Sequence, residues 1–218
     1  NCKKGHLWKI GTIGKPIDHI EVKIAEDGEI LCKGSNIMLG YYKNEEQTRN
    51  AIDEDGFFHT GDIGFLDEEG FLTITDRKKE MFKTSGGKYI APQYIENKLK
   101  QSRFIEQAMV VGEGEKMPAA FLQVNFAFVR EWLKRHGDKQ TLSNEALVKD
   151  ERVRERITQE VERINKKLGK WEQIKVFDLT PDEWSIDGGH LTPTLKLKRR
   201  IILEKYKDMY NTFYNKES

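Results

Sequence analysis

The chain has 218 residues, and its hydrophobic fraction of 37% suits one or two domains with small cores. Its 37 basic and 36 acidic residues nearly cancel, which argues against a nucleic-acid surface, because binding the phosphate backbone needs a surplus of Lys and Arg. No apolar run is long enough to span a bilayer, and the chain does not open on a signal-peptide pattern.

The first third of the chain is predicted to fold as short strands and tight turns. Polar and apolar residues alternate over two pairs of segments, and turns at Asp27-Gly28 and Asp67–Gly70 join each pair as a hairpin. A short helical pattern over residues 45–52 lies between the hairpins. The predicted strands cover residues 19–25, 28–34, 63–66 and 71–75. We therefore expect a β-rich subdomain over residues 1–75.

Beyond residue 80 the pattern becomes a mixture of helices and strands. The longest predicted helix has an apolar stripe on one side and stops at Gly169. The predicted helices cover residues 92–102, 127–136, 150–168 and 198–213, and the predicted strands cover residues 108–112, 119–126 and 174–179. This order predicts the α+β class, with helices packed on a sheet layer.

Residues 59–90 hold the most informative pattern. Asp62 follows Gly61, so its carboxylate is expected to project from a tight turn and to accept hydrogen bonds from both hydroxyls of a ribose. Arg77 supplies a planar fork of donors for a phosphate or ribose oxygen. Gly86-Gly87 permits a sharp turn or a closely approaching ligand. Each feature alone is ordinary, because it could be a β-turn or a solvated run of charges. Their order predicts a site for the sugar of a nucleotide beside a domain hinge.

These motifs resemble those of the adenylate-forming superfamily, which comprises acyl-CoA synthetases, luciferases and peptide-synthetase adenylation domains. The corresponding segments are His59–Asp62, Asp76–Glu80, Ser85–Tyr89 and Ile95-Glu96. The resemblance extends along nearly the whole chain. It implies that residues 1–75 form a small barrel-like subdomain that ends a large N-terminal domain. Residues 76–79 would be a hinge, and residues 80–218 a mobile α+β lid domain.

The resemblance also implies roles for individual residues. Thr60, Asp62 and Arg77 correspond to nucleotide-binding positions, and Lys79 corresponds to the hinge residue. The turn that borders the tunnel for the thiol arm of coenzyme A comprises Ser85, Gly86 and Gly87.

A second motif lies downstream, where residues 191–200 have the sequence LTPTLKLKRR. Without the resemblance, the run is a basic helix start or a group of solvated cations. It is similar to the Pro-containing loop that carries the catalytic Lys of long-chain fatty acyl-CoA synthetases, which implies that role for Lys196. The Gly that usually precedes this Lys is replaced by Leu195. Residues 198–200 are then expected to be surface charges that open the last helix.

The resemblance implies a reaction in two steps. A fatty carboxylate attacks the α-phosphate of ATP to give an acyl-adenylate and pyrophosphate, and the thiol of coenzyme A then displaces AMP to give a thioester. Fatty acid, ATP and coenzyme A are the implied small-molecule substrates, with Mg²⁺ bound mainly by a preceding N-terminal part. Asn1 follows no Met and the ATP phosphate loop is absent from the sequence, so we expect a fragment of a longer enzyme that is inactive alone.

Two other functions stay open at this point. The first is a fatty acyl-AMP ligase, or another adenylating enzyme with a different acceptor. The second is a non-catalytic module that binds adenosine or docks a partner. ATP–pyrophosphate exchange separates the enzymes from the module.

The cysteines and histidines bear on location and on metals. Cys2 and Cys32 are too few for a disulfide framework, so we expect free thiols in a reducing compartment, the cytoplasm. The five His residues are scattered without ligand spacing, so we expect no metal site. Peripheral contact with a membrane and the oligomeric state are left open by the sequence.

Overall fold

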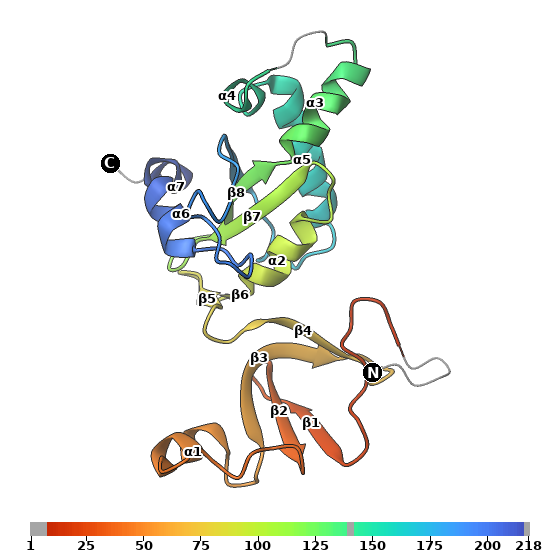
Figure 1. Cartoon of the computed structure of the whole chain (residues 1–218), viewed down its shortest axis with the longest axis vertical. Coiled ribbons are helices and arrows are strands. Elements are labelled where there is room, and N and C mark those ends of the chain that lie inside the picture. The colour runs from red at the N-terminus through yellow and green to blue at the C-terminus, as the bar shows by residue number, and fades with distance from the viewer. Residues whose placement is uncertain (1–7, 139–141, 216–218) are drawn as a thin grey trace. The chain divides into compact units, whose positions relative to one another are not determined.

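The computed structural model describes residues 8–138 and 142–215 (Figure 1). The chain divides into two compact units, an N-terminal unit over Asn1–Met81 and a C-terminal unit over Phe82–Ser218. Within the described residues, no helix combines the length and the apolar character needed to cross a membrane.

The N-terminal unit is built on an antiparallel sheet with the strand order β1-β2-β3-β4, which curls like half a barrel (Figure 1). Both predicted hairpins are confirmed. Gly28 and Gly70 lie at their turns with φ of +85° and +79°, a region that Gly enters without steric cost. The elements are β1 (Ile20–Ile24), β2 (Glu29–Gly34), α1 (Glu45–Ala51), β3 (Phe58–Leu66) and β4 (Leu72–Arg77).

The Thr-Gly-Asp motif of residues 60–62 forms a bulge inside β3, so the prediction of a tight turn was wrong. Between two successive registered pairs, β2 advances by two residues and β3 by four, which leaves two extra residues in β3. Gly61 has a φ of +70°, and this lets the strand bend. A Gly-Asp pair signals a local bend, but only the pairing of β3 with the distant β2 decides that the bend lies within a strand.

The C-terminal unit is built on the sheet β7-β8-β9, with β7 and β8 antiparallel and β8 and β9 parallel. A two-stranded hairpin of β5 and β6 precedes it. The strands are β5 (Phe82–Lys83), β6 (Tyr89–Ile90), β7 (Ile105–Val111), β8 (Ala119–Val124) and β9 (Val176–Thr180). The helices are α2 (Pro92–Leu99), α3 (Phe126–Arg135), α4 (Asn144–Leu147), α5 (Glu151–Asn165), α6 (Arg199–Lys205) and α7 (Lys207–Phe213).

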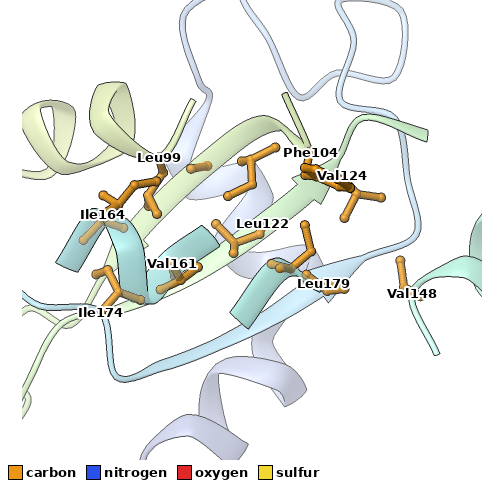
Figure 2. Close-up of a cluster of buried hydrophobic side chains, with 14 of the residues drawn as sticks. Leu99, Phe104, Leu122, Val124, Val148, Val161, Ile164, Ile174 and Leu179 are labelled. Carbon is orange, nitrogen blue, oxygen red and sulfur yellow. The ribbon is translucent and has the colours of Figure 1, made fainter. Parts of the chain in front are cut away.

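Helices cover both faces of this sheet, and β7 and β8 each contribute side chains to the core on either face. Successive residues of a strand point to opposite faces. Leu122 therefore packs with α2, α3 and α5, and Figure 2 shows it among side chains that include Val161 and Ile164 of α5. Phe121 packs in the second core with α6 and α7. The predicted α+β class, a sheet layer with packed helices, is confirmed.

The predicted closing helix over residues 198–213 is two helices, α6 and α7, because the chain leaves helical torsions at Tyr206 (φ −106°, ψ 30°). The ring of Tyr206 packs against Phe121, and its hydroxyl donates to Asp182 at 2.5 Å. Inward-facing residues continue through the break, with Ile202 before it and Phe213 after it, so the apolar period could not reveal it. The short elements α4, β5 and β6 were also not predicted.

We expect Leu122→Ala to lower the free energy of unfolding of the C-terminal unit by about 2–5 kcal/mol. Leu122 is fully buried in the central strand, so its truncation leaves a cavity between the sheet and α5. Ile186→Ala is the control, because that side chain is 45% exposed, and it should cost less than about 1 kcal/mol. Urea unfolding followed by circular dichroism measures both variants, and equal losses would contradict this placement of Leu122.

Candidate functional site

The bulge in β3 brings together two of the predicted nucleotide-binding residues. Oδ1 of Asp62 lies 2.7 Å from Nε of Arg77, which is its cross-strand partner on β4. The Asp62 side chain is 22% exposed and the Arg77 side chain 60%, so the pair borders solvent. A carboxylate accepts hydrogen bonds from hydroxyls, and a guanidinium donates hydrogen bonds to phosphate or ribose oxygens. The pair therefore has the chemistry to bind the ribose and a phosphate of a nucleotide.

Thr60, the third predicted nucleotide-binding residue, uses its hydroxyl inside the bulge. The hydroxyl donates to the carbonyl oxygen of Ile30 at 2.7 Å and accepts from the backbone N–H of Asp62 at 3.1 Å. Thr60 thereby links β3 to β2 and holds the backbone of Asp62 in place.

Glu29 is the residue of this region that the sequence prediction missed. It is 3% exposed, and its carboxylate accepts hydrogen bonds from the Gly61 N–H at 2.9 Å and from Nζ of Lys78 at 2.8 Å. Nδ1 of His59 lies 3.0 Å from the same carboxylate, and Lys78 also pairs with Asp27 at 2.7 Å. Locally, Glu29 only opens a strand after a turn. No local signal could have found it, because its partners lie between 30 and 49 residues away in the chain.

The charges of this cluster stabilise one another. Burial acts to raise the pKa of the Glu29 carboxyl, but hydrogen bonds from Lys78, His59 and Gly61 outweigh it and hold the pKa below the usual 4.5. Hydrogen bonds to Asp27 and Glu29 raise the pKa of the Lys78 ammonium above the usual 10.5. The contribution of Glu29 to stability is thus present above pH 4.5 and lost as pH falls through its lowered pKa. That of Lys78 is present below pH 10.5 and lost as pH rises through its raised pKa.

Lys79, the predicted hinge residue, lies in a turn that follows β4. The N–H of Lys78 donates to the carbonyl oxygen of Gly61 at 2.8 Å, and the N–H of Glu80 donates to that of Arg77 at 2.9 Å. Lys79 itself is exposed, and its side chain makes no hydrogen bond or ion pair with any residue the structure describes. The turn is therefore anchored on the Lys78 side and solvated at Lys79.

In the C-terminal unit, Ser85, Gly86 and Gly87 form the exposed turn of the β5–β6 hairpin. Gly87 has a φ of +77°, and its N–H donates to the carbonyl oxygen of Thr84 at 2.9 Å. The N–H of Ser85 donates to the carbonyl oxygen of Glu115 at 2.9 Å, which joins this turn to the loop between β7 and β8.

Lys196 directly follows the tip of a small hairpin whose ends, Leu191 and Leu197, form an antiparallel bridge. Thr192 organises the tip: its N–H donates to the Lys196 carbonyl oxygen at 2.8 Å, and its hydroxyl accepts from the Lys196 N–H at 3.0 Å. The ammonium of Lys196 is exposed and has no hydrogen bond or ion pair within the described part of the chain. An ordered backbone thus displays an unpaired cation.

Leu195 adopts the left-handed backbone conformation that a Gly would take at this place. Its φ is +60°, and its side chain is 65% exposed. A residue with a Cβ pays about 1–2 kcal/mol for this conformation. The backbone at Leu195 is therefore locally strained.

Arg199 is not a surface charge, so that prediction was wrong. Its two terminal nitrogens bind the two carboxylate oxygens of Glu96, each at 2.8 Å. Glu96 is 4% exposed and also accepts from the Val110 N–H at 2.7 Å, so the ion pair joins α6 to α2 and β7. A bidentate pair of this kind fixes orientation. Here it fixes the start of α6, directly after the loop that carries Lys196. The sequence could not show it, because the two residues are 103 positions apart.

Comparison with known families decides to which family the chain belongs. Residues 80–218, more than half of the chain, match the family described as AMP-binding enzyme C-terminal domain. The chain belongs to this family. The resemblance to adenylate-forming enzymes is thereby confirmed.

Relatives of this AMP-binding enzyme C-terminal domain match nearly the whole chain. Long-chain-fatty-acid--CoA ligase FadD15 from Mycobacterium tuberculosis is 39% identical over 209 residues, which are 96% of this chain and 35% of the relative. Long-chain-fatty-acid--CoA ligase 1 from Homo sapiens is 33% identical over 222 residues, which cover 95% of this chain and 32% of the relative. The chain spans about a third of the length of these curated relatives.

Solved structures of adenylate-forming enzymes share the fold. The A domain of carboxylic acid reductase from Segniliparus rugosus, in complex with AMP, matches with a TM-score of 0.64 and 23% identity, over 92% of this chain and 32% of that chain. O-succinylbenzoate Coenzyme A Synthetase (MenE) from Bacillus subtilis, in complex with AMP, matches with a TM-score of 0.57 and 25% identity. This match covers 88% of this chain and 35% of that chain.

We expect Leu195→Gly to stabilise this AMP-binding enzyme C-terminal domain by about 0.5–1 kcal/mol, because it removes the left-handed strain but adds unfolded-state entropy. Leu195→Val should destabilise it instead, since a β-branched side chain fits this conformation poorly. Little burial changes, because Leu195 is 65% exposed. Thermal unfolding ranks the three proteins, and a Val variant as stable as the Gly variant would contradict the strain.

Proposed function

We propose that this chain is the C-terminal part of an ATP-dependent ligase that activates a long-chain fatty acid to an acyl-adenylate and then forms the acyl-CoA thioester. The family match and the long-chain-fatty-acid--CoA ligases among the relatives support this function. The observation that carries it is the exposed, unpaired ammonium of Lys196 on an ordered hairpin, as seen among the described residues. In the proposed first step, this cation stabilises the negative charge that builds up on the fatty carboxylate and the α-phosphate of ATP.

In the same proposal, the Asp62–Arg77 pair binds the nucleotide. The Asp62 carboxylate accepts hydrogen bonds from the two ribose hydroxyls, and Arg77 donates to a phosphate or ribose oxygen. A half-buried carboxylate that is already oriented by a neighbouring guanidinium loses little freedom when it binds, and this favours affinity.

The second step needs an open path for the pantetheine arm of coenzyme A. We assign its border to the exposed turn Ser85–Gly87, where two Gly residues present no side chain. The thiolate attacks the acyl carbonyl, the bond to the adenylate oxygen breaks, and AMP leaves. Lys79 is the proposed hinge between the two steps, because its exposed side chain can stay solvated in either pose.

No group of three or more His, Cys, Asp or Glu among the described residues could hold a metal ion. Mg²⁺ is proposed only as the ion that accompanies ATP in the full-length protein.

ATP–pyrophosphate exchange in the presence of a long-chain fatty acid tests the proposed function. The full-length protein should exchange and should form acyl-CoA when coenzyme A is added, whereas the 218-residue chain should do neither. Exchange without thioester formation would instead indicate an acyl-AMP ligase with another acceptor. Absence of exchange with the folded full-length protein would leave a binding module and overturn the proposal.

We expect Lys196→Ala in the full-length protein to slow adenylation by about 10²-fold or more, because a cation aimed at the developing charge is lost. Thioester formation from supplied acyl-adenylate should stay near the normal rate. Lys198→Ala is the matched control, two residues away in the same loop, and should alter neither step. Equal small effects of the two substitutions would show that Lys196 is an ordinary surface charge.

A further inference from the structure

Glu29 links three parts of the N-terminal unit that are distant in sequence: the start of β2, the bulge in β3 and the residue after β4. Its carboxylate accepts from the Gly61 N–H at 2.9 Å and from Nζ of Lys78 at 2.8 Å. The N–H of Lys78 also donates to the carbonyl oxygen of Gly61 at 2.8 Å, so Glu29, Gly61 and Lys78 form a closed ring of hydrogen bonds. Gly61 is therefore held from both sides, on one side by Glu29 and on the other by Lys78.

The position of the Asp62 carboxylate depends on this ring of hydrogen bonds. Asp62 is bonded directly to Gly61, so rotation of the Gly61 backbone would move Asp62 relative to Arg77, which lies 2.7 Å away in the structure. Gly has the widest choice of torsions of any residue and supplies no restraint of its own. The restraint comes from the buried Glu29 carboxylate, whose side chain is only 4% exposed.

We propose that Glu29 is a positioning residue that holds the Asp62 carboxylate in place for the nucleotide and anchors Lys78, directly before the proposed hinge residue Lys79. The inference rests on the proposed function for the identity of the ligand. Burying a carboxylate is costly unless donors surround it, which means that the cluster is kept together as a unit. Lys79, exposed and without a described partner, is then the first residue after the anchor that can change its torsions in a domain swing.

Amide hydrogen exchange on the 218-residue chain tests the anchoring without any enzyme assay. In Glu29→Gln, a neutral amide oxygen replaces the charged acceptor, so the amides of Gly61 and Lys78 should exchange about tenfold faster. Glu21→Gln is the matched control, because it removes a carboxylate from the same sheet whose side chain is 58% exposed. It should leave both amides unchanged.

The Michaelis constant for ATP in pyrophosphate exchange by the full-length protein tests the positioning. Asp62→Ala, which removes the proposed ribose acceptor, sets the scale and should raise this constant about tenfold or more. Glu29→Gln should raise it by a similar factor, although Glu29 does not touch the nucleotide in this proposal, and Glu21→Gln should not raise it. Lys78→Met, which removes one donor from Glu29 at a site that is 45% exposed, should give a smaller rise in the same direction.

Each outcome decides the proposal. Unchanged exchange of Gly61 and Lys78 in folded Glu29→Gln would overturn it, whatever the enzyme activity. Faster exchange with an unchanged Michaelis constant, while Asp62→Ala raises that constant, would reduce Glu29 to a structural role. An unchanged constant in Asp62→Ala as well would refute the nucleotide assignment itself, and the positioning proposal would fall with it. If Glu29→Gln does not fold, Lys78→Met is judged by the same two measurements.

Discussion

A bulge inside a sheet leaves backbone polar groups without ladder partners, and this constraint organises the N-terminal unit. The N–H of Gly61 donates to the carboxylate of Glu29. The hydroxyl of Thr60 donates to the carbonyl oxygen of Ile30 and accepts from the N–H of Asp62. A buried carboxylate needs donors in turn, and Lys78 and His59 supply them. The position of Asp62 beside Arg77 thus follows from the hydrogen bonds that the backbone groups of the bulge require.

A second buried carboxylate has the corresponding role in the C-terminal unit. Glu96 binds both terminal nitrogens of Arg199 and the N–H of Val110, so it ties α6 to the sheet. The Leu191–Leu197 bridge closes the loop that carries Lys196, and the ion pair holds the chain at Arg199, two residues after this bridge. The strain at Leu195 persists because these contacts determine the shape of the loop. In each unit, a polar contact between distant segments holds a candidate functional loop in shape.

Local signals predicted most of the elements correctly. The Asp27-Gly28 hairpin and the apolar stripe of α5 needed nothing beyond neighbouring residues. The errors arose where distant contacts override a local pattern. The Thr-Gly-Asp segment bends within a strand because β2 pairs across it, and the last helix breaks at Tyr206 because its ring and hydroxyl are held by Phe121 and Asp182.

The sequence by itself determined the α+β class, the hairpins and the family, because turn chemistry, apolar period and ordered motifs are properties of neighbouring residues. Its motifs also singled out Asp62 and Lys196 as candidates. Only the tertiary structure decided which charges are buried and paired. Glu29 meets a Lys 49 residues away, and Glu96 meets an Arg 103 residues away, whereas Lys196 stays exposed. Pairing depends on distance and burial, which arise only when segments far apart in the chain pack together.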